Sequence, residues 1–236
     1  MHPDGSEYEK LVYPYLFEGG TASAEEVLAQ VCCSTREKCC ETMALRRATL
    51  ERAEQQIIAA AKAMGQAFAS GATLFAFGNG GSSTDVQDLV CDLVAPSLPK
   101  SRPLPAIALT NDSAVITAVG NDIGFDTIFA RQIIALGRRG DIAFGISTSG
   151  NSSNMLLAFE QAKKQGLLTI ALTGYDGGKI ARSPAIDICI ISPSDHIPRI
   201  QEAQATVYHA LLEVVQALLP NDGREDDGRD LCPSWV

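Results

Sequence analysis

The chain has 236 residues, 46% of them hydrophobic, which is enough to bury the core of one moderate-sized domain. Its formal net charge of -9 opposes binding to nucleic acid or to anionic membranes over most of the surface. Its apolar runs are too short to span a bilayer, and Met1–Ser6 show no basic or apolar leader. We therefore expect a cytoplasmic protein with neither nucleic-acid nor membrane partners.

The first part of the chain predicts helix. Ser23 followed by Glu26 is a capping-box pattern, and helical apolar spacing continues to about residue 70, as one long helix or two consecutive ones. We assign residues 1–45 to a partly helical N-terminal extension and residues 46–220 to the main domain. The acidic, glycine-containing residues 221–236 predict a disordered tail.

Four cysteines lie in the N-terminal extension. They are Cys32, Cys33, Cys39 and Cys40. Members seven residues apart share a helical face, so we expect small apolar packing along a helix–helix contact, with a metal or redox role as the alternative. The odd total of seven cysteines in a chain without an export signal argues against a disulfide framework.

After residue 71 the pattern becomes an alternation of strands and helices. Continuous apolar runs predict strands at 73–77, 105–109, 141–146, 167–172 and 186–191. Helical patterns follow them at about 83–95, 113–136, 152–165, 177–183 and 197–219. This alternation is typical of an α/β fold whose parallel sheet is covered by helices on both faces. Ligands in such folds bind beyond the carboxyl ends of the strands.

Two glycine- and serine-rich loops follow the first and third predicted strands. They read Gly78-Asn79-Gly80-Gly81-Ser82-Ser83 and Ser147-Thr148-Ser149-Gly150-Asn151-Ser152. Each opens a helix, whose N-terminal N–H groups and dipole favour an anion, and the hydroxyls of the second loop can donate to phosphate. Neither loop is a P-loop, and ordinary turns between strand and helix are the alternative. We expect the two loops to share one crevice.

Polar residues on two helices could carry chemistry. Asp88 and Asp92 are four residues apart and therefore share a helical face. Asp85 is expected only to complement the helix dipole, whereas Asp92 lies among apolar neighbours, which should perturb its pKa as a general base requires. His209 lies mid-helix, about two turns after Gln201 on a shared face. The alternative for His209 is a hydrogen-bonded core histidine, and the alternative for Gln201 is an ordinary polar residue in the first turn of the helix.

Two further segments predict turns by themselves. Asn121-Asp122 indicates a turn between helices, and Gly174–Lys179 indicates a turn followed by a helix.

Five segments together resemble the SIS (sugar isomerase) domain family and, within it, the phosphoheptose isomerases. They are residues 78–82, 119–125, 145–152, 172–179 and 199–202, in the order and spacing of that family. The resemblance covers about residues 50–219 and implies a three-layer αβα sandwich with a five-stranded parallel sheet, preceded by N-terminal helices. It also implies a homotetramer with active sites between subunits.

The resemblance implies isomerisation of sedoheptulose 7-phosphate to D-glycero-D-manno-heptose 7-phosphate through an enediol, with Asp92 as base and His209 as acid. It implies that the phosphorylated sugar is bound by Asn79, Gly80, Gly81, Ser82, Asn121, Asp122, Ser147, Thr148, Ser149, Ser152 and Gln201, with the serines and threonine of 147–152 on the phosphate. A divalent metal, zinc in the family, is implied at Asp88, Asp92, Gln201 and His209.

The chain departs from the family on the helix after the first loop. Where the family usually carries His-x-x-x-Glu, this chain reads Asp88-Leu89-Val90-Cys91-Asp92. Asp in place of Glu shortens the base by one methylene, and Asp in place of His removes a nitrogen ligand and favours harder cations than zinc. Some related SIS proteins are non-catalytic regulators, including one that binds the replication initiator DnaA. The alternative to an isomerase is therefore such a regulator or a sugar-phosphate-binding module.

Overall fold

The computed structural model describes residues 23–97 and 101–219. The chain divides into two compact units, Met1–Glu41 and Thr42–Val236, which are described separately. The tail predicted at 221–236 lies outside the described residues. None of the described helices is both long and apolar enough to cross a membrane.

The first described helix, α2 (Ala24–Ala69), is the single long helix among the two predicted options. Its capping box is confirmed: the Ser23 N–H donates to Glu26 Oε2 at 2.9 Å, and the Glu26 N–H donates to Ser23 Oγ at 3.1 Å. These two bonds satisfy donors that the first helical turn leaves without a partner.

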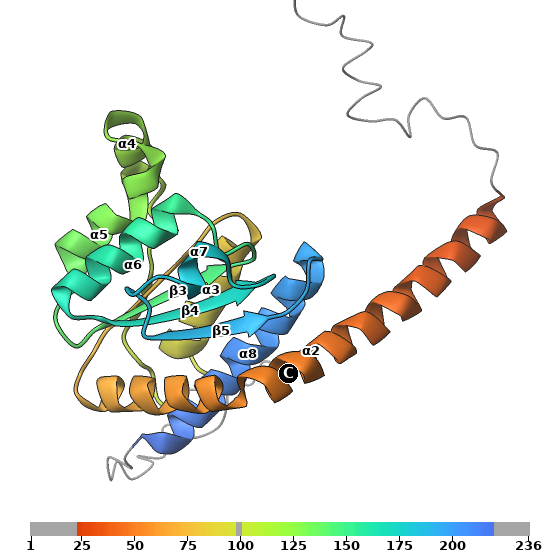
Figure 1. The fold of residues 1–236 in the computed structure, drawn as a ribbon, viewed down its shortest axis with the longest axis horizontal. Coiled ribbons are helices and arrows are strands. Elements are labelled where there is room, and N and C mark those ends of the chain that lie inside the picture. The colour runs from red at the N-terminus through yellow and green to blue at the C-terminus, as the bar shows by residue number, and fades with distance from the viewer. Residues whose placement is uncertain (1–22, 98–100, 220–236) are drawn as a thin grey trace, which may run out of the picture. The chain divides into compact units, whose positions relative to one another are not determined.

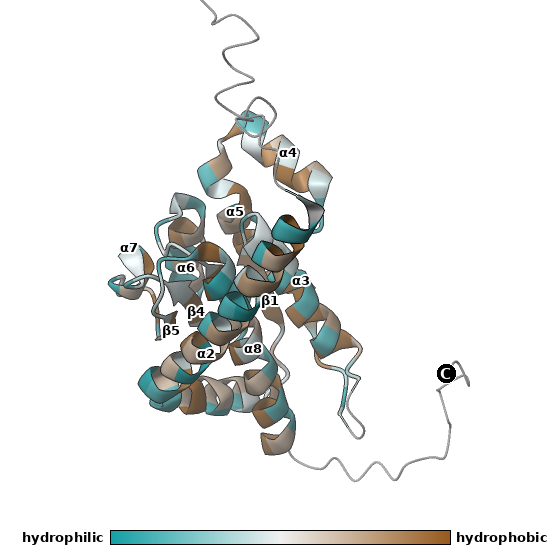
Figure 2. Ribbon diagram, turned by 90° about the vertical axis from the view of Figure 1, so that its right-hand side faces the viewer, coloured by the Kyte–Doolittle hydropathy of each residue, from teal (hydrophilic) through white to brown (hydrophobic). Residues whose placement is uncertain are grey.

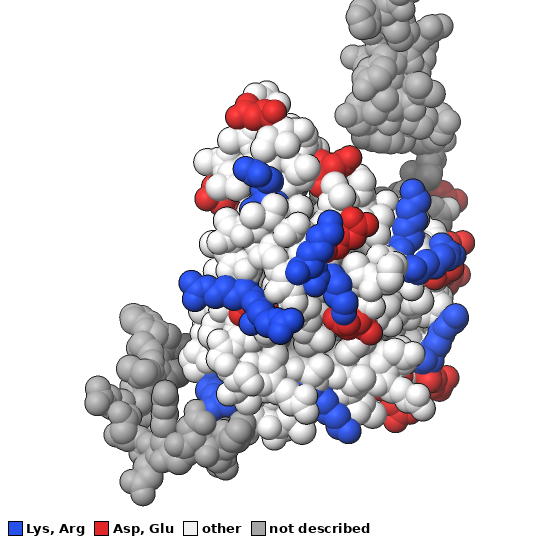
Figure 3. All heavy atoms as spheres, turned by 60° about the vertical axis from the view of Figure 1, so that its left-hand side comes forward, with Lys and Arg blue, Asp and Glu red and all other residues white. Residues whose placement is uncertain are grey.

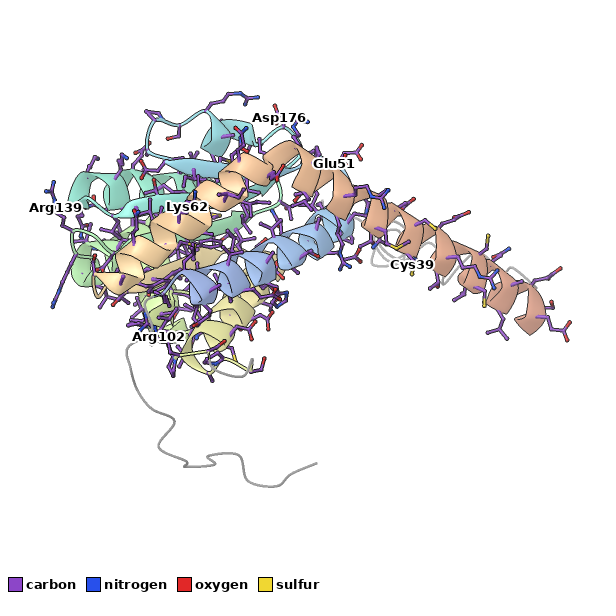
Figure 4. All side chains as sticks on the ribbon, turned by 90° about the horizontal axis from the view of Figure 1, so that it is seen from below. Cys39, Glu51, Lys62, Arg102, Arg139 and Asp176 are labelled. Atoms are coloured by element: carbon purple, nitrogen blue, oxygen red, sulfur yellow. The ribbon has the colours of Figure 1, made fainter. Side chains whose placement is uncertain are left out.

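The four clustered cysteines, of which Figure 4 labels Cys39, lie on α2 and are exposed. Among the described residues, therefore, these thiols do not make the expected helix–helix packing. Because a helix rises 1.5 Å per residue, thiols seven residues apart are separated by about 10.5 Å, too far for one ion or one disulfide in a single chain.

Five strands of the second unit form one parallel sheet (Figure 1). They are β1 (Leu74–Gly78), β2 (Ala106–Ala108), β3 (Ile142–Ser147), β4 (Leu168–Gly174) and β5 (Ile188–Ser192), in the order β2-β1-β3-β4-β5. Every predicted strand is confirmed. β1 and β3 are buried along their whole length, as their continuous apolar sequence requires.

Helices cover both faces of this sheet. Leu74 and Ala76 of β1 pack in one core with α2, α3 (Gly81–Val94) and α8 (Ile197–Leu218). Phe75 and Phe77, which alternate with them, pack on the other face with α5 (Ile128–Leu136), α6 (Ser153–Gln165) and α7 (Gly178–Ala181). The helices carry hydrophobic and hydrophilic residues along their length (Figure 2), as helices with one buried face do. The three-layer αβα sandwich is confirmed.

The prediction of one helix over 113–136 is wrong. The segment forms α4 (Ser113–Asp122), the short 3-10 helix η2 (Phe125–Thr127) and α5. Gly124 between them adopts a φ of 133°, which no helix permits, so the apolar periodicity continues while the backbone breaks. The turn predicted at Asn121-Asp122 follows directly after those two residues.

Positive and negative side chains are interspersed on the face drawn in Figure 3. Lys163 pairs with Asp187, and Arg182 pairs with Asp176. Exposed pairs of this kind contribute little to stability.

Candidate active site

Helices α3 and α8 lie side by side and place most of the predicted catalytic residues. Gly81, at the start of α3, lies against Gln201 in the first turns of α8. Further along both helices, Asp92 lies beside His209. Because the contacts advance in the same direction along both helices, α3 and α8 run parallel, and they rest on the same face of the sheet.

The first glycine loop links three elements. A Cβ added to Gly81 would lie 2.1 Å from Nε2 of Gln201, so the missing side chain allows the carboxamide to lie directly on the loop. Asn79 and Asn154 exchange two hydrogen bonds of 2.9 Å between their side-chain amides. Since Asn154 belongs to α6, this exchange ties the first loop to the helix that follows the second loop. The structure thus brings the predicted sugar contacts Asn79, Gly80, Gly81 and Gln201 together, and Ser82, which follows Gly81, is buried.

The second loop is held in a tight turn. Ser147 Oγ accepts the N–H of Gly150 at 3.0 Å, and Gly150 lies against the backbone of Gly177 and Gly178. Ser152 is the N-cap residue of α6, yet its side chain makes no capping hydrogen bond. The first-turn N–H groups of α6 and the half-buried hydroxyls of Thr148, Ser149 and Ser152 are therefore suited to an anion.

Asn121 and Asp122 lie elsewhere in this chain. They are exposed at the end of α4, where Asn121 Nδ2 donates to Asp122 Oδ1 at 2.8 Å. Helix α4 packs mainly on η2 and α5 and projects from the sheet in Figure 1. The structure does not bring these two predicted sugar contacts to α3 and α8 of the same chain.

Asp88, Asp92 and His209 form a close group of ionisable side chains. Their ligand atoms all lie within 4.8 Å of one another. His209 Nε2 is 3.4 Å from Oδ2 of Asp88 and 3.4 Å from Oδ2 of Asp92. A cavity of about 310 Å³ opens beside Asp92 and His209, with Leu93 and Leu212 among its walls. A small molecule can therefore reach this pair of helices.

The same three side chains fit a divalent cation. Two carboxylates and one imidazole are ligands of the kind found in catalytic metal sites, which keep open positions for water or substrate. An oxygen-rich set suits Mn²⁺ or Mg²⁺ as well as zinc. Gln201, the fourth predicted ligand, has its carboxamide on Gly81, eight residues and about 12 Å of helix before His209. The structure thus brings together three of the four predicted ligands.

Sequence reasoning assigned one residue of this site, Asp85, only to the helix dipole and did not single out another, Tyr208. Asp85 Oδ2 is buried with no hydrogen-bond partner, and burial, followed by the charge of Asp88, raises the pKa of Asp85 to about 6. Asp85 is thus a half-buried carboxyl whose Oδ2 atom is fully buried, while the side chain of Asp92 remains 34% exposed. The spacing of Asp85 could have indicated its place, because it lies four residues after Gly81 and three before Asp88 and so shares their helical face.

Tyr208 is the residue of this site that the sequence did not indicate. Its hydroxyl donates to Asp88 Oδ2 at 2.7 Å, and the ring is buried. Burial, and then the hydrogen bond to Asp88, raise the pKa of Tyr208, so the phenol stays protonated and acts as the donor.

Replacing Asp85 by asparagine should stabilise the metal-free protein above pH 6 and change little near pH 4. The folded pKa of about 6 lies above the ordinary 3.8, so the folded state binds more protons between these values and loses stability as pH rises through them. Asparagine removes this loss. Because Asp85 is only half-buried, solvent screening reduces the expected gain to about 1 kcal/mol.

Urea unfolding of both proteins at pH 4.5, 6 and 7.5 measures this gain. Asp176→Asn is the control of opposite sign, because the Gly178 N–H and then Arg182 lower the pKa of Asp176. The stability that this lowered pKa contributes is fully present above the ordinary value of 3.8, so Asp176→Asn should be less stable than the wild type by the same small amount at all three pH values. A gain for Asp85→Asn that is the same at all three pH values would contradict the assigned burial of the charge.

A family model described as the SIS domain matches residues 40–174. The phosphoheptose isomerase of Aquifex aeolicus is 43% identical over 179 residues, which cover 76% of this chain and 93% of that protein. The phosphoheptose isomerase of Geotalea daltonii is 44% identical over 169 residues, covering 72% and 87% of the two chains.

Solved structures agree with these relatives. The phosphoheptose isomerase of Francisella tularensis superimposes with a TM-score of 0.73 at 36% identity, over 81% of this chain and 98% of that one. The phosphoheptose isomerase of Neisseria gonorrhoeae gives a TM-score of 0.72 at 34% identity, over 81% and 99%. Sequence and fold therefore agree: the chain belongs to the SIS domain family, in the group of the phosphoheptose isomerases.

Proposed function

We propose that this protein is an isomerase that interconverts sedoheptulose 7-phosphate and D-glycero-D-manno-heptose 7-phosphate. The observation that carries the proposal is the meeting of Asp92 and His209, at 3.4 Å, on the two helices that also hold the first glycine loop and Gln201. A carboxylate and an imidazole at this distance can serve as base and acid for one substrate. The relatives that match most of this chain are phosphoheptose isomerases.

The two loops bind different parts of the substrate. In this proposal the N-terminus of α6 and the hydroxyls of Ser147, Thr148, Ser149 and Ser152 hold the phosphate. Asn79, Gly80, Gly81, Ser82 and Gln201 hold the sugar. The two hydrogen bonds between Asn79 and Asn154 fix the distance between these subsites. Asn121 and Asp122 also contact the sugar in this proposal, and they do so from a neighbouring subunit, because they lie away from α3 in their own chain.

Isomerisation moves one proton between two adjacent carbons. The Asp92 carboxylate takes the proton from C1 of the ketose, and the electrons of that bond form the C1=C2 double bond. His209 gives a proton to the carbonyl oxygen on C2, which completes the enediol. Asp92 then returns its proton to C2, and His209 takes the hydroxyl proton from the oxygen on C1, which yields the aldose.

Asp88, Asp92 and His209 would also hold the divalent metal. When bound, such an ion supplies Lewis-acid polarisation of the substrate oxygens at the reacting carbons. Zinc follows from the resemblance, whereas the two carboxylates favour a harder cation.

We further propose that the protein works as a homotetramer in the cytoplasm, as the resemblance implies. Met43, Leu50 and Ile58 of α2 are large apolar side chains that the second unit leaves exposed. Exposed apolar surface of this kind is typical of a face that associates with another copy.

The experiment is NMR of the purified protein with sedoheptulose 7-phosphate in D₂O, with and without added Mn²⁺ or Zn²⁺. The expected result is new aldose anomeric signals with deuterium at the exchanged carbon. Signals that appear only with added metal would support the assigned ligands. Saturable line broadening of the sugar phosphate without product would favour the sugar-phosphate-binding module instead. The absence of both turnover and binding would contradict the proposal.

A further inference from the structure

Tyr208 is a buried residue whose only polar atom faces the active site. The residue is 2% exposed, and its hydroxyl donates to Asp88 Oδ2 at 2.7 Å across the α3–α8 contact. Asp88 itself has 54% of its side chain exposed. An exposed carboxylate on a helix samples several rotamers, so a hydrogen bond from a rigid buried ring selects one of them.

The selected rotamer is the one that faces His209. The same oxygen, Asp88 Oδ2, lies 3.4 Å from His209 Nε2. Tyr208 and His209 are neighbours in the chain, with ring centroids 4.5 Å apart. Two adjacent side chains of α8 thus converge on one oxygen of α3. A phenylalanine at position 208 would fill the same space but could not donate a hydrogen bond to the Asp88 carboxylate.

We infer that Tyr208 is a positioning residue for the site: it holds the Asp88 carboxylate toward His209 and so preforms the group Asp88–Asp92–His209. The inference rests on the proposed function, since it assigns a role within that site. It concerns how the group is organised and not a contact with substrate, because Tyr208 acts through Asp88. Partners that orient a metal ligand in this way typically change metal affinity by about 10–100-fold.

The test is Tyr208→Phe in the full chain, compared with Asp88→Ala and with the double variant. For Tyr208→Phe we expect Mn²⁺ binding, measured by titration calorimetry with the metal alone, to weaken by about 10–100-fold. We expect kcat to fall by a similar factor and KM for the sugar phosphate to stay within about twofold, since the two loops are untouched. In the Asp88→Ala background the same tyrosine change should have no further effect, because its target is gone.

NMR of the His209 imidazole makes the test independent of turnover. In metal-free protein, Tyr208→Phe should shift the imidazole NMR signals of His209 when Asp88 is present and leave them in place in the Asp88→Ala background. His209→Gln identifies these signals. Thr206→Val, which removes an exposed hydroxyl from the same helix, should change neither the signals nor kcat.

The outcomes separate the inference from the proposed function. A wild-type protein without isomerase activity would contradict the proposed function, and the His209 signals would then decide the role of Tyr208 alone. Equal losses from Tyr208→Phe with and without Asp88 would show a merely structural role and overturn the inference. Unshifted His209 signals in Tyr208→Phe would overturn it as well.

Discussion

Asp92→Asn should lower kcat for heptose phosphate isomerisation by about 10²–10⁴-fold, the usual contribution of a general base. Asparagine keeps the shape of the side chain but cannot accept the carbon-bound proton. The loss corresponds to about 3–5 kcal/mol in the barrier, since each tenfold change is about 1.4 kcal/mol. KM should change little, because the phosphate and sugar loops lie at the other end of α3. Steady-state kinetics and loss of deuterium incorporation in D₂O measure both effects.

The matched control is Cys91→Ser, one residue earlier on α3 and exposed, which should keep full kcat. His209→Gln should resemble Asp92→Asn, and the double variant should be little worse than either single one, since the two residues act together in forming the same enediol. Metal content is measured on every variant, because Asp92 and His209 are also assigned as ligands. Full kcat in a metal-replete Asp92→Asn protein would remove Asp92 as the base.

The fold could be predicted because its signals are local. Each strand is a short apolar run that ends in a turn, and those runs predicted β1 to β5 in the right places. The failure at 113–136 has a different cause. Apolar periodicity continues from α4 into α5, so the pattern alone indicates one helix, whereas the break depends on the backbone of Gly124. A single glycine inside an apolar pattern does not indicate whether its backbone dihedrals will be helical.

The site could be predicted only in part. Spacing places Asp88 and Asp92 on one face of α3, but their meeting with His209 depends on how two helices more than 100 residues apart pack together. Local sequence carries no information on that packing, and the family resemblance supplied it. The burial of Asp85 and the role of Tyr208 could not be predicted from local sequence either. The burial of Asp85 depends on the folded structure around α3, and the hydrogen bond from Tyr208 to Asp88 joins α8 to α3.

The second glycine loop offers the other large expected effect. Gly150→Ala should destabilise the protein by about 2–5 kcal/mol, the sum of left-handed strain and overpacking. Gly150 has a φ of +64°, and a Cβ there would lie 2.1 Å from the carbonyl oxygen of Gly177. That oxygen is backbone and cannot swing away, so either the 147–152 loop or the turn at Gly177 must move.

Either movement disturbs the contact that holds the loop assigned to the phosphate, so the variant should also bind sedoheptulose 7-phosphate more weakly. Gly140→Ala is the matched control, because Gly140 has a φ of +92° but open space where a Cβ would lie. It should lose only the strain, about 1–2 kcal/mol, and keep the KM of the wild type. Urea unfolding and KM together separate the two causes: equal stability losses in both variants would mean that the loop does not pack tightly on Gly177. A stable Gly150→Ala protein with unchanged KM would remove this loop from phosphate binding.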